Sequence, residues 1–207
     1  MSTNLRLRGC AAAVVAALAV LAGVSCSDTV RTGRSPAYLI IEGMEGIHGA
    51  DDSLVDANFA SDVRTFGGVY EDSGVAHMRI AFRDVDYNAA VGPTDNNAIT
   101  INRYRVSYRR ADGRNTPGVD VPWPFEGATT ATIREETESV SFVLVRIQAK
   151  LESPLVQIVS STAGIGGAGA ISTVADITFY GRDQAGNEVT VTGSMDVTFA
   201  DWADPEN

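Results

Sequence analysis

Residues 174–200, VADITFYGRDQAGNEVTVTGSMDVTFA, lie near the end of the 207-residue chain and have the pattern of two consecutive β-strands. In residues 174–180 and again in residues 188–200, apolar side chains recur at every second position, which is the period of a half-buried β-strand. The residues between them, DQAGN at 183–187, offer Gly and Asn for the positive φ angles of a short hairpin loop. The sequence therefore predicts a terminal β-hairpin. Its core-facing positions are Ala175, Ile177 and Phe179, then Val189, Val191, Met195, Val197 and Phe199.

Three earlier segments are also typical of β-strands. Residues 38–41 form an apolar run that predicts the first strand, and residues 75–82 predict another, with the even-numbered side chains facing the core. Residues 140–151 alternate most regularly, so we expect one continuous strand there. Its buried positions are expected to be Val143, Val145, Ile147, Ala149 and Leu151. The pattern of residues 43–74 does not identify an element.

The apolar side chains of residues 99–108 change phase part-way along the segment. They occupy odd positions first and even positions afterwards, so one extra residue must be inserted near residues 102–103. We expect a β-bulge there, and a turn at residues 111–114 (ADGR) that ends the segment. The apolar positions are Ile99 and Ile101, followed by Tyr104, Val106 and Tyr108.

Strand signals alternate with turn residues over residues 37–207, and none of these windows sustains the helical apolar period of 3.6 residues. The fold class predicted is all-β, an antiparallel β-sandwich. Residues 104–108 (YRVSY), with Asp112-Gly113 after them, resemble the central strand of fibronectin type III modules, and residues 183–187 are similar to the last hairpin of bacterial immunoglobulin-like repeats. The resemblance implies an immunoglobulin-like sandwich used for adhesion, assembly or ligand contact, with no catalytic residues to transfer.

The charge balance limits the classes of partner. The chain has 16 basic and 26 acidic residues, for a net charge of −10. Arg6 and Arg8 lie in the first 25 residues, so the rest of the chain carries 14 basic against 26 acidic residues. Nucleic acid would be repelled by a surface of this charge, so we expect no nucleic-acid partner.

The first 25 residues have the organisation of an export signal. Arg6 and Arg8 precede an uncharged apolar run, residues 10–24, which is short for a membrane span and is followed directly by polar sequence. Residues 21–26 (LAGVSC) resemble the lipobox of bacterial lipoproteins. This resemblance implies that Cys26 receives diacylglycerol and becomes the new N-terminus. The alternatives are ordinary signal-peptidase cleavage with a free thiol at Cys26, or a retained N-terminal anchor helix.

Lipidation of Cys26 would determine where the protein resides. Residues 26–36 form a polar linker that spans about 30 Å when fully extended, so the domain would lie close to the bilayer. In a Gram-negative host, Ser27 after the cysteine implies sorting to the outer membrane. The only other cysteine, Cys10, lies inside the leader, so the processed chain has no pair for a disulfide.

A loop rich in oxygen ligands is the best candidate for a cation site. Asp84, Asp86, Asn88 and Asp95 have side chains of the type that Ca²⁺ requires, and their spacing begins like an EF-hand loop. The spacing then departs from that motif, because Ala89 replaces its glycine and Asp95 replaces its last glutamate. The alternative is a solvated loop in which Asp and Asn favour turns.

A row of arginines and an aromatic pair are candidates for contact with a ligand or partner. Arg103, Arg105 and Arg109 share one strand face and would suit an anionic glycan, a lipid headgroup or a partner carboxylate. The alternative is that they pair with acidic residues on neighbouring strands. Trp123 and Phe125, among prolines, either present aromatic rings to a sugar or close one end of the sandwich.

Other motifs do not support an enzyme. Gly164, Gly166 and Gly169 match G-x-G-x-x-G, and residues 156–159 before them read as a strand, but a strand rather than a helix follows at residue 174, so we expect no nucleotide site. The two histidines, His48 and His77, lack a partner at zinc-ligand spacing. No nucleophile has a positioned base.

The sequence therefore predicts a non-enzymatic, membrane-tethered envelope lipoprotein without a cofactor, acting as a structural or protein-interaction module. The alternative is a β-sandwich that binds calcium or an envelope glycan.

Overall fold

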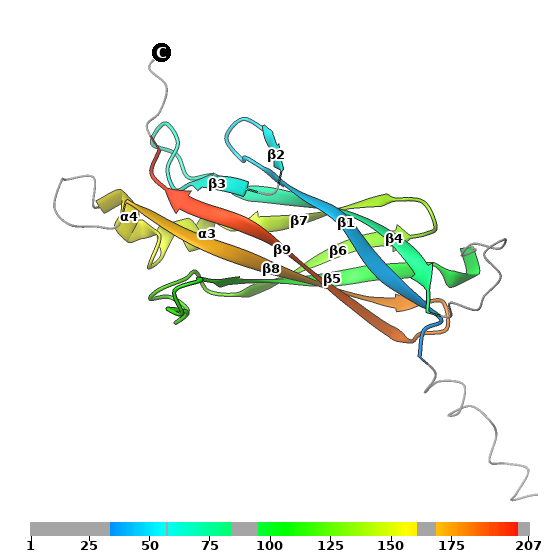
Figure 1. Cartoon of the computed structure of the whole chain (residues 1–207). Coiled ribbons are helices and arrows are strands. Elements are labelled where there is room, and N and C mark those ends of the chain that lie inside the picture. The colour runs from blue at the N-terminus through cyan, green and yellow to red at the C-terminus, as the bar shows by residue number, and fades with distance from the viewer. Residues whose placement is uncertain (1–33, 57, 84–94, 161–168, 203–207) are drawn as a thin grey trace, which may run out of the picture. The chain divides into compact units, whose positions relative to one another are not determined.

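The computed structural model describes residues 34–56, 58–83, 95–160 and 169–202, and shows two β-sheets that face one another (Figure 1). The chain divides into two units, Met1–Arg34 and Ser35–Asn207, and the second contains the sandwich. In spatial order, the first sheet consists of β2 (Leu54–Asp56), β1 (Ala37–Ile47), β4 (Asp72–Phe82) and β7 (Glu138–Val145). The second consists of β3 (Asn58–Asp62), β9 (Glu188–Ala200), β8 (Ala170–Asp183), β5 (Ile99–Arg109) and β6 (Phe125–Ile133).

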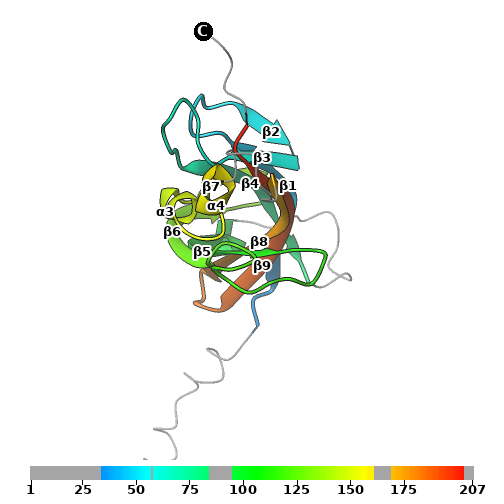
Figure 2. The same ribbon diagram turned by 90° about the vertical axis from the view of Figure 1, so that its left-hand side faces the viewer.

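The topology confirms the predicted all-β sandwich. Figure 2 shows the two layers nearly end-on. Pairs of neighbouring strands are antiparallel, except that β3 runs parallel to β9. The order β1-β4-β7 in one sheet and β5-β8-β9 in the other is that of strands A-B-E and C-F-G in the immunoglobulin-like arrangement.

The terminal hairpin forms as the sequence predicts. β8 and β9 pair along their whole length, and the predicted core positions of β8 are fully buried. Gly186 in the connecting loop has a φ of +87°, which glycine adopts without strain. Asp183 accepts hydrogen bonds from the amides of Ala185 and Asn187, and from the Asn187 side chain. Burial opposes ionisation of Asp183, but these bonds outweigh it and lower the pKa of its carboxyl.

The predicted phase change in β5 is also confirmed. The pairing of β5 shifts register between Ile101 and Arg103 against both of its neighbours, β6 and β8. Because of the bulge, the odd-numbered apolar residues before it and the even-numbered apolar residues after it point into the same core. The residues buried by β5 are Ile99, Ile101, Tyr104, Val106 and Tyr108.

Two of these tyrosines connect the sheets. The Tyr108 hydroxyl donates to the Leu144 carbonyl oxygen at 2.5 Å, and the Val143 amide donates to the Tyr104 hydroxyl oxygen at 3.0 Å. Both backbone groups belong to β7, the outermost strand of the first sheet, so β5 supplies hydrogen-bond partners to an edge in the opposite layer. Burial raises the pKa of Tyr108, so the hydroxyl keeps its proton.

The prediction of one continuous strand over residues 140–151 is wrong. β7 ends at Val145, a short helix α3 (Ile147–Leu151) follows, and Ile147 and Leu151 are exposed. Within β7 the even positions Val140, Phe142 and Leu144 are buried, because residues 140–145 are apolar on both parities and Ser139 and Ser141 lie on the solvated face. Of the predicted buried positions, Val145 and Ala149 are buried, whereas Val143 is only half-buried.

Two further expectations also need correction. Residues 156–159, read from the sequence as a strand, lie in helix α4 (Val156–Ser160). In β4 the predicted core positions Ala76, Met78 and Ile80 are buried as expected, whereas Phe82 at its end is only half-buried. Residues 43–74, where no element was predicted, contain the end of β1 and all of β2 and β3.

Helix α3 carries a buried charge into the core. Lys150 is the only lysine in the chain, and its side chain is 1% exposed. Its Nζ lies 2.8 Å from Oδ2 of Asp72, at the start of β4. The same carboxylate accepts the Ser61 hydroxyl at 2.6 Å and the Gly49 amide at 3.1 Å. Four segments that are separate in the sequence, α3, β4, β3 and the β1–β2 loop, are therefore joined at Asp72.

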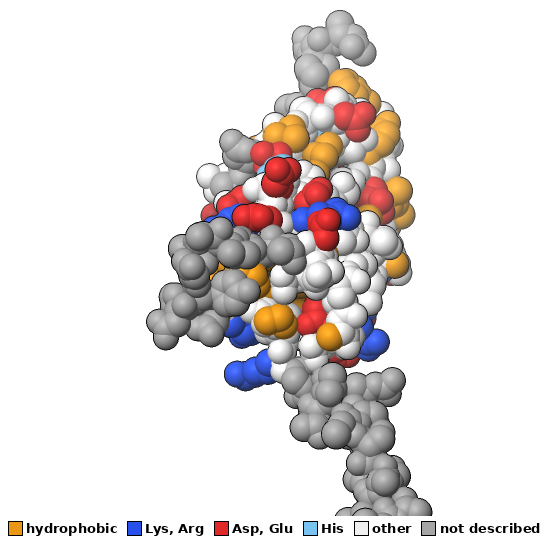
Figure 3. Space-filling view, turned by 90° about the vertical axis from the view of Figure 1, so that its right-hand side faces the viewer, with side chains coloured by type: hydrophobic (Ala, Val, Ile, Leu, Met, Phe, Trp, Pro, Cys, Tyr) orange, Lys and Arg blue, Asp and Glu red, His pale blue; other side chains and the backbone are white. Residues whose placement is uncertain are grey.

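The molecular surface is mixed in charge. Figure 3 shows acidic and basic side chains next to one another across the middle of one face, with hydrophobic side chains on both sides of them. No helix in the described part of the chain is long and apolar enough to cross a membrane.

The Asp72 cluster generates a stability prediction. Replacing Lys150 by methionine leaves a buried carboxylate without its counter-ion, so Lys150→Met should lower the free energy of unfolding by about 3–5 kcal/mol, measured by urea denaturation. The double variant Lys150→Met with Asp72→Asn removes both charges and keeps an acceptor for Gly49. It should recover part of that loss. A double variant no more stable than Lys150→Met would contradict a charge-based explanation.

Candidate functional site at the open edge of β9

β9 is paired unevenly on its two sides. β8 pairs with it from Glu188 to Ala200, but on the other side β3 pairs only with residues 196–200. Residues 188–195 therefore have no strand on that side among the segments that the structure describes. An edge of this kind presents a row of backbone N–H and C=O groups that remain available for pairing.

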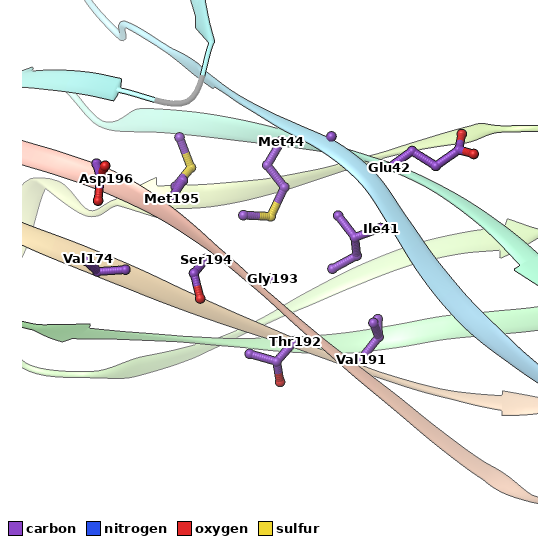
Figure 4. Close-up of a pocket in the computed structure, with 11 residues that line it drawn as sticks. Ile41, Glu42, Met44, Val174, Val191, Thr192, Gly193, Ser194, Met195 and Asp196 are labelled. Carbon is purple, nitrogen blue, oxygen red and sulfur yellow. The ribbon is translucent and has the colours of Figure 1, made fainter.

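β1 is open beside it in the same way. β4 pairs along β1, while β2 covers only residues 45–47 on the other side. Between these two edges lies a groove of about 490 Å³, lined by residues 41–44 of β1, Val174 of β8 and residues 191–196 of β9. We call it the β1–β9 groove. Consecutive residues of two strands form its walls, so backbone as well as side chains borders the space (Figure 4).

A bulge and a glycine explain how the two strands cross. The register of β1 shifts between Ile41 and Gly43, which bends the strand. Figure 4 shows Ile41 and Met44 extending from β1 towards β9 near Gly193. A Cβ at Gly193 would lie 2.8 Å from Met44 Sδ and 2.9 Å from Ile41 Cδ1, so only glycine fits there without movement. The close approach gives the groove an apolar wall made of Ile41, Met44 and the partly buried Val191.

Acidic residues lie at the rim of the groove. Glu42, at the bulge, pairs with Arg79 and accepts the Thr137 hydroxyl at 2.6 Å. The hydrogen bonds from Thr137 and Arg79 lower the pKa of Glu42, so it is charged at neutral pH. Asp196 lies at the other end, where β3 begins. A charge and a bulge on an edge strand hinder strand pairing, so Glu42 and the bulge protect the edge of β1 rather than that of β9.

The arginines singled out in the sequence lie on the outer face of the second sheet. Arg103 and Arg105 pair with Glu126 of β6 at 3.2 and 3.4 Å, and Arg109 pairs with Asp176 of β8 at 2.8 Å. This is the geometry expected of charges that pair with acidic residues on neighbouring strands. The Arg103 guanidinium also lies over the Tyr180 ring, 4.1 Å from its centre.

Trp123 and Phe125 are in different environments. Phe125, the first residue of β6, is buried and meets Tyr104 edge-to-face at a centroid distance of 6.4 Å. Trp123 is 53% exposed and packs beside Gly118. Phe125 therefore belongs to the core, whereas about half of the Trp123 side chain is exposed.

Several predicted sites lie outside the described residues. These are the lipidation site Cys26, the calcium candidates Asp84, Asp86 and Asn88, and Gly164 and Gly166 of the glycine motif. Asp95 is described: it begins a single 3₁₀ turn (Asp95–Asn97) and pairs with Arg134 at 3.3 Å. Across the described segments, no three acidic, His or Cys side chains are grouped closely enough to hold a metal ion.

No protein-family model and no curated protein matches this sequence. The candidate site therefore rests on geometry. Sequence reasoning identified β9 but missed its open edge, because alternation locates a strand without showing how far its neighbour extends. Two features of the sequence could have indicated the groove. Gly193 is a glycine inside a strand, which often marks the close approach of another backbone, and Glu42 is a charged residue beside an apolar run.

The packing at Gly193 can be tested by substitution. Gly193→Val should displace the ends of the Met44 and Ile41 side chains and lower the free energy of unfolding by about 1 kcal/mol in urea denaturation, the low end of overpacking costs, because both side chains are flexible and border the groove. Gly43→Val is the matched control on the facing strand, because the nearest atom to its Cβ is His77 Cδ2 at 3.9 Å. A change within about 0.5 kcal/mol is expected for it. Equal losses in the two variants would show that Gly193 is not specially packed.

Proposed function

We propose that this chain is an exported, membrane-tethered lipoprotein whose β-sandwich recruits an envelope protein by accepting one of its strands along the open edge of β9. The leader sequence and the lipobox-like residues 21–26 support export and acylation at Cys26. The sandwich unit begins at Ser35, so the segment after Cys26 is short. The tether would hold the groove within reach of other proteins at the same membrane.

The observation that carries the proposal is the uncovered edge at residues 188–195 next to a groove. An incoming strand would lie about 4.8 Å from β9, in line with β3, which already occupies the rest of that edge. Main-chain hydrogen bonds would supply affinity, and alternate side chains would enter the groove and supply specificity. Ile41 and Met44 favour apolar side chains at those positions.

The residues that line the groove support binding rather than catalysis. They are apolar, small or hydroxyl-bearing side chains together with Glu42 and Asp196. No histidine, lysine or cysteine is among them, so the hydroxyl groups of Thr192 and Ser194 have no basic side chain beside them in the groove. Glu42 is already engaged by Arg79 and Thr137.

The tether is tested by metabolic labelling with a fatty-acid analogue. The wild-type chain should incorporate the label and fractionate with membranes, and globomycin should block its processing. Cys26→Ala should lose the label, because the thioether to diacylglycerol has no attachment atom. Labelling that persists in Cys26→Ala would contradict acylation at this residue.

Strand acceptance is tested by photo-crosslinking in the native envelope. A benzophenone amino acid at Thr192 should capture a partner, whereas the same group at Thr130 should not. Both threonines are exposed and belong to the same sheet, but Thr130 lies in β6 at the opposite edge. A synthetic peptide of the captured segment should then slow amide exchange in residues 188–195. Equal capture at Thr130, or unchanged exchange, would contradict strand addition at β9.

A further inference from the structure

A second surface lies at the end of the sandwich formed by the β1–β2 loop, the β3–β4 connection and residues 201–202. We call it the loop end. Four exposed apolar side chains belong to it, with exposed fractions of 42 to 59%: Leu54, Phe66, Tyr70 and Trp202. Hydrophobic and acidic side chains are interspersed towards this end in Figure 3. It does not include the β1–β9 groove, so the inference drawn from it does not depend on strand acceptance.

Phe66 is displayed in an unfavourable backbone conformation. Thr65 and Gly68 bond to each other through both amides, at 3.0 and 2.8 Å, which encloses a two-residue turn. Phe66 has a φ of +49° and Gly67 a φ of +76°, as in a type I′ turn. Asn or Gly is preferred at the first of these positions, and a positive φ is strained for a bulky side chain. Phe66 is 59% exposed, so more than half of its side chain is accessible to a partner.

A pocket of about 320 Å³ opens at the same end. Its lining includes His48, Asp51, Ser53, Asp62, Thr65 and Trp202. His48 stacks on the buried Phe59 with a centroid distance of 4.5 Å, so its ring forms a flat wall. Asp62 accepts the backbone amide of Trp202 at 3.3 Å and the Thr65 hydroxyl at 3.0 Å, and both Asp62 and Trp202 line the pocket.

The charge of the loop end identifies the class of ligand. Asp51, Asp52, Asp62 and Glu71 lie on it, against Arg64. Hydrogen bonds from Ser53 lower the pKa of Asp51, which is ionised at neutral pH. A carboxylate beside an indole suits a guanidinium, which pairs with carboxylates in plane and stacks on aromatic faces. An anionic lipid surface would be repelled by the same charges.

We infer that the loop end binds a basic segment of a partner protein. One arginine side chain of that segment enters the pocket between Trp202 and the carboxylates of Asp51 and Asp62. Phe66 and Leu54 pack against apolar residues on either side of that arginine. Aromatic anchors around a charged pair are the usual composition of energetically dominant interface sites.

The probe for the pocket is N-acetyl-arginine amide, with N-acetyl-citrulline amide as its uncharged isostere. The chain has two tryptophans, Trp202 in the pocket and Trp123 outside it, so the two indole N–H signals in an NMR spectrum of the full-length protein provide a site and an internal control. Trp202→Phe assigns the signals. Arginine amide should shift the Trp202 signal saturably in the millimolar range and leave Trp123 unchanged, whereas citrulline amide should have no effect.

Asp51→Asn should weaken the arginine response at least threefold, because it removes one carboxylate from the pocket. A Trp202 signal that does not saturate with arginine amide, or that responds equally to citrulline amide, would overturn the inference. A response to N-acetylglucosamine in place of arginine would assign the pocket to a glycan. If the wild-type protein sediments with phosphatidylcholine vesicles and Phe66→Asn does not, the loop end would instead be assigned to membrane contact, and the inference would be overturned.

Phe66 provides a separate test. Phe66→Asn places the preferred residue in the turn, so the variant should melt at a higher temperature than the wild type. That result would show that phenylalanine is held there against stability. An unchanged or lower melting temperature would overturn the argument that Phe66 is displayed at a cost to the fold.

Discussion

The buried ion pair between Lys150 and Asp72 holds together four segments that are distant in the sequence. A charge in the core requires a close partner, and the only lysine of the chain meets the first residue of β4 at 2.8 Å. Asp72 also accepts hydrogen bonds from Ser61 of β3 and from the amide of Gly49 in the β1–β2 loop. It therefore fixes the positions of a short strand and a loop. β3 is thereby placed beside the last five residues of β9, and the β1–β2 loop is held in its place within the loop end.

The two lateral edges of the sandwich are treated differently. On one side, Tyr104 and Tyr108 cross from the second sheet and bond the backbone of β7, which reduces the number of free groups on that strand. On the other side, β3 covers one end of β9 and the remainder faces the β1–β9 groove. Unpaired edges are an aggregation hazard that proteins normally block. In this fold, two buried tyrosine hydroxyls bond to the edge strand β7, whereas residues 188–195 of β9 have no such partner among the described segments. This difference is the basis for proposing that β9 accepts a strand.

Local patterns predicted the parts of the fold that local chemistry determines. The β8–β9 hairpin follows from alternation and a Gly-containing loop, and the bulge in β5 follows from the phase change at residue 102. The end of β7 did not follow, because Lys150 turns inward only in the presence of Asp72, which is distant in the sequence. The short strands β2 and β3 were missed for the same reason, since their partners β1 and β9 define them. The arginine pairs with Glu126 and Asp176 were anticipated as one of two alternatives, whereas the loop end needed the three-dimensional fold.

The most direct test of this account is residue-resolved amide hydrogen exchange of β9 in the purified protein without a partner. Within residues 188–195, the amides directed towards β8 should be protected while those directed towards the open edge exchange rapidly. Within residues 196–200, where β3 is held in place through Ser61 and Asp72, both sets should be protected. Outer amides in residues 188–195 that are protected as strongly as those in residues 196–200 would show that the edge is covered, and would contradict the account.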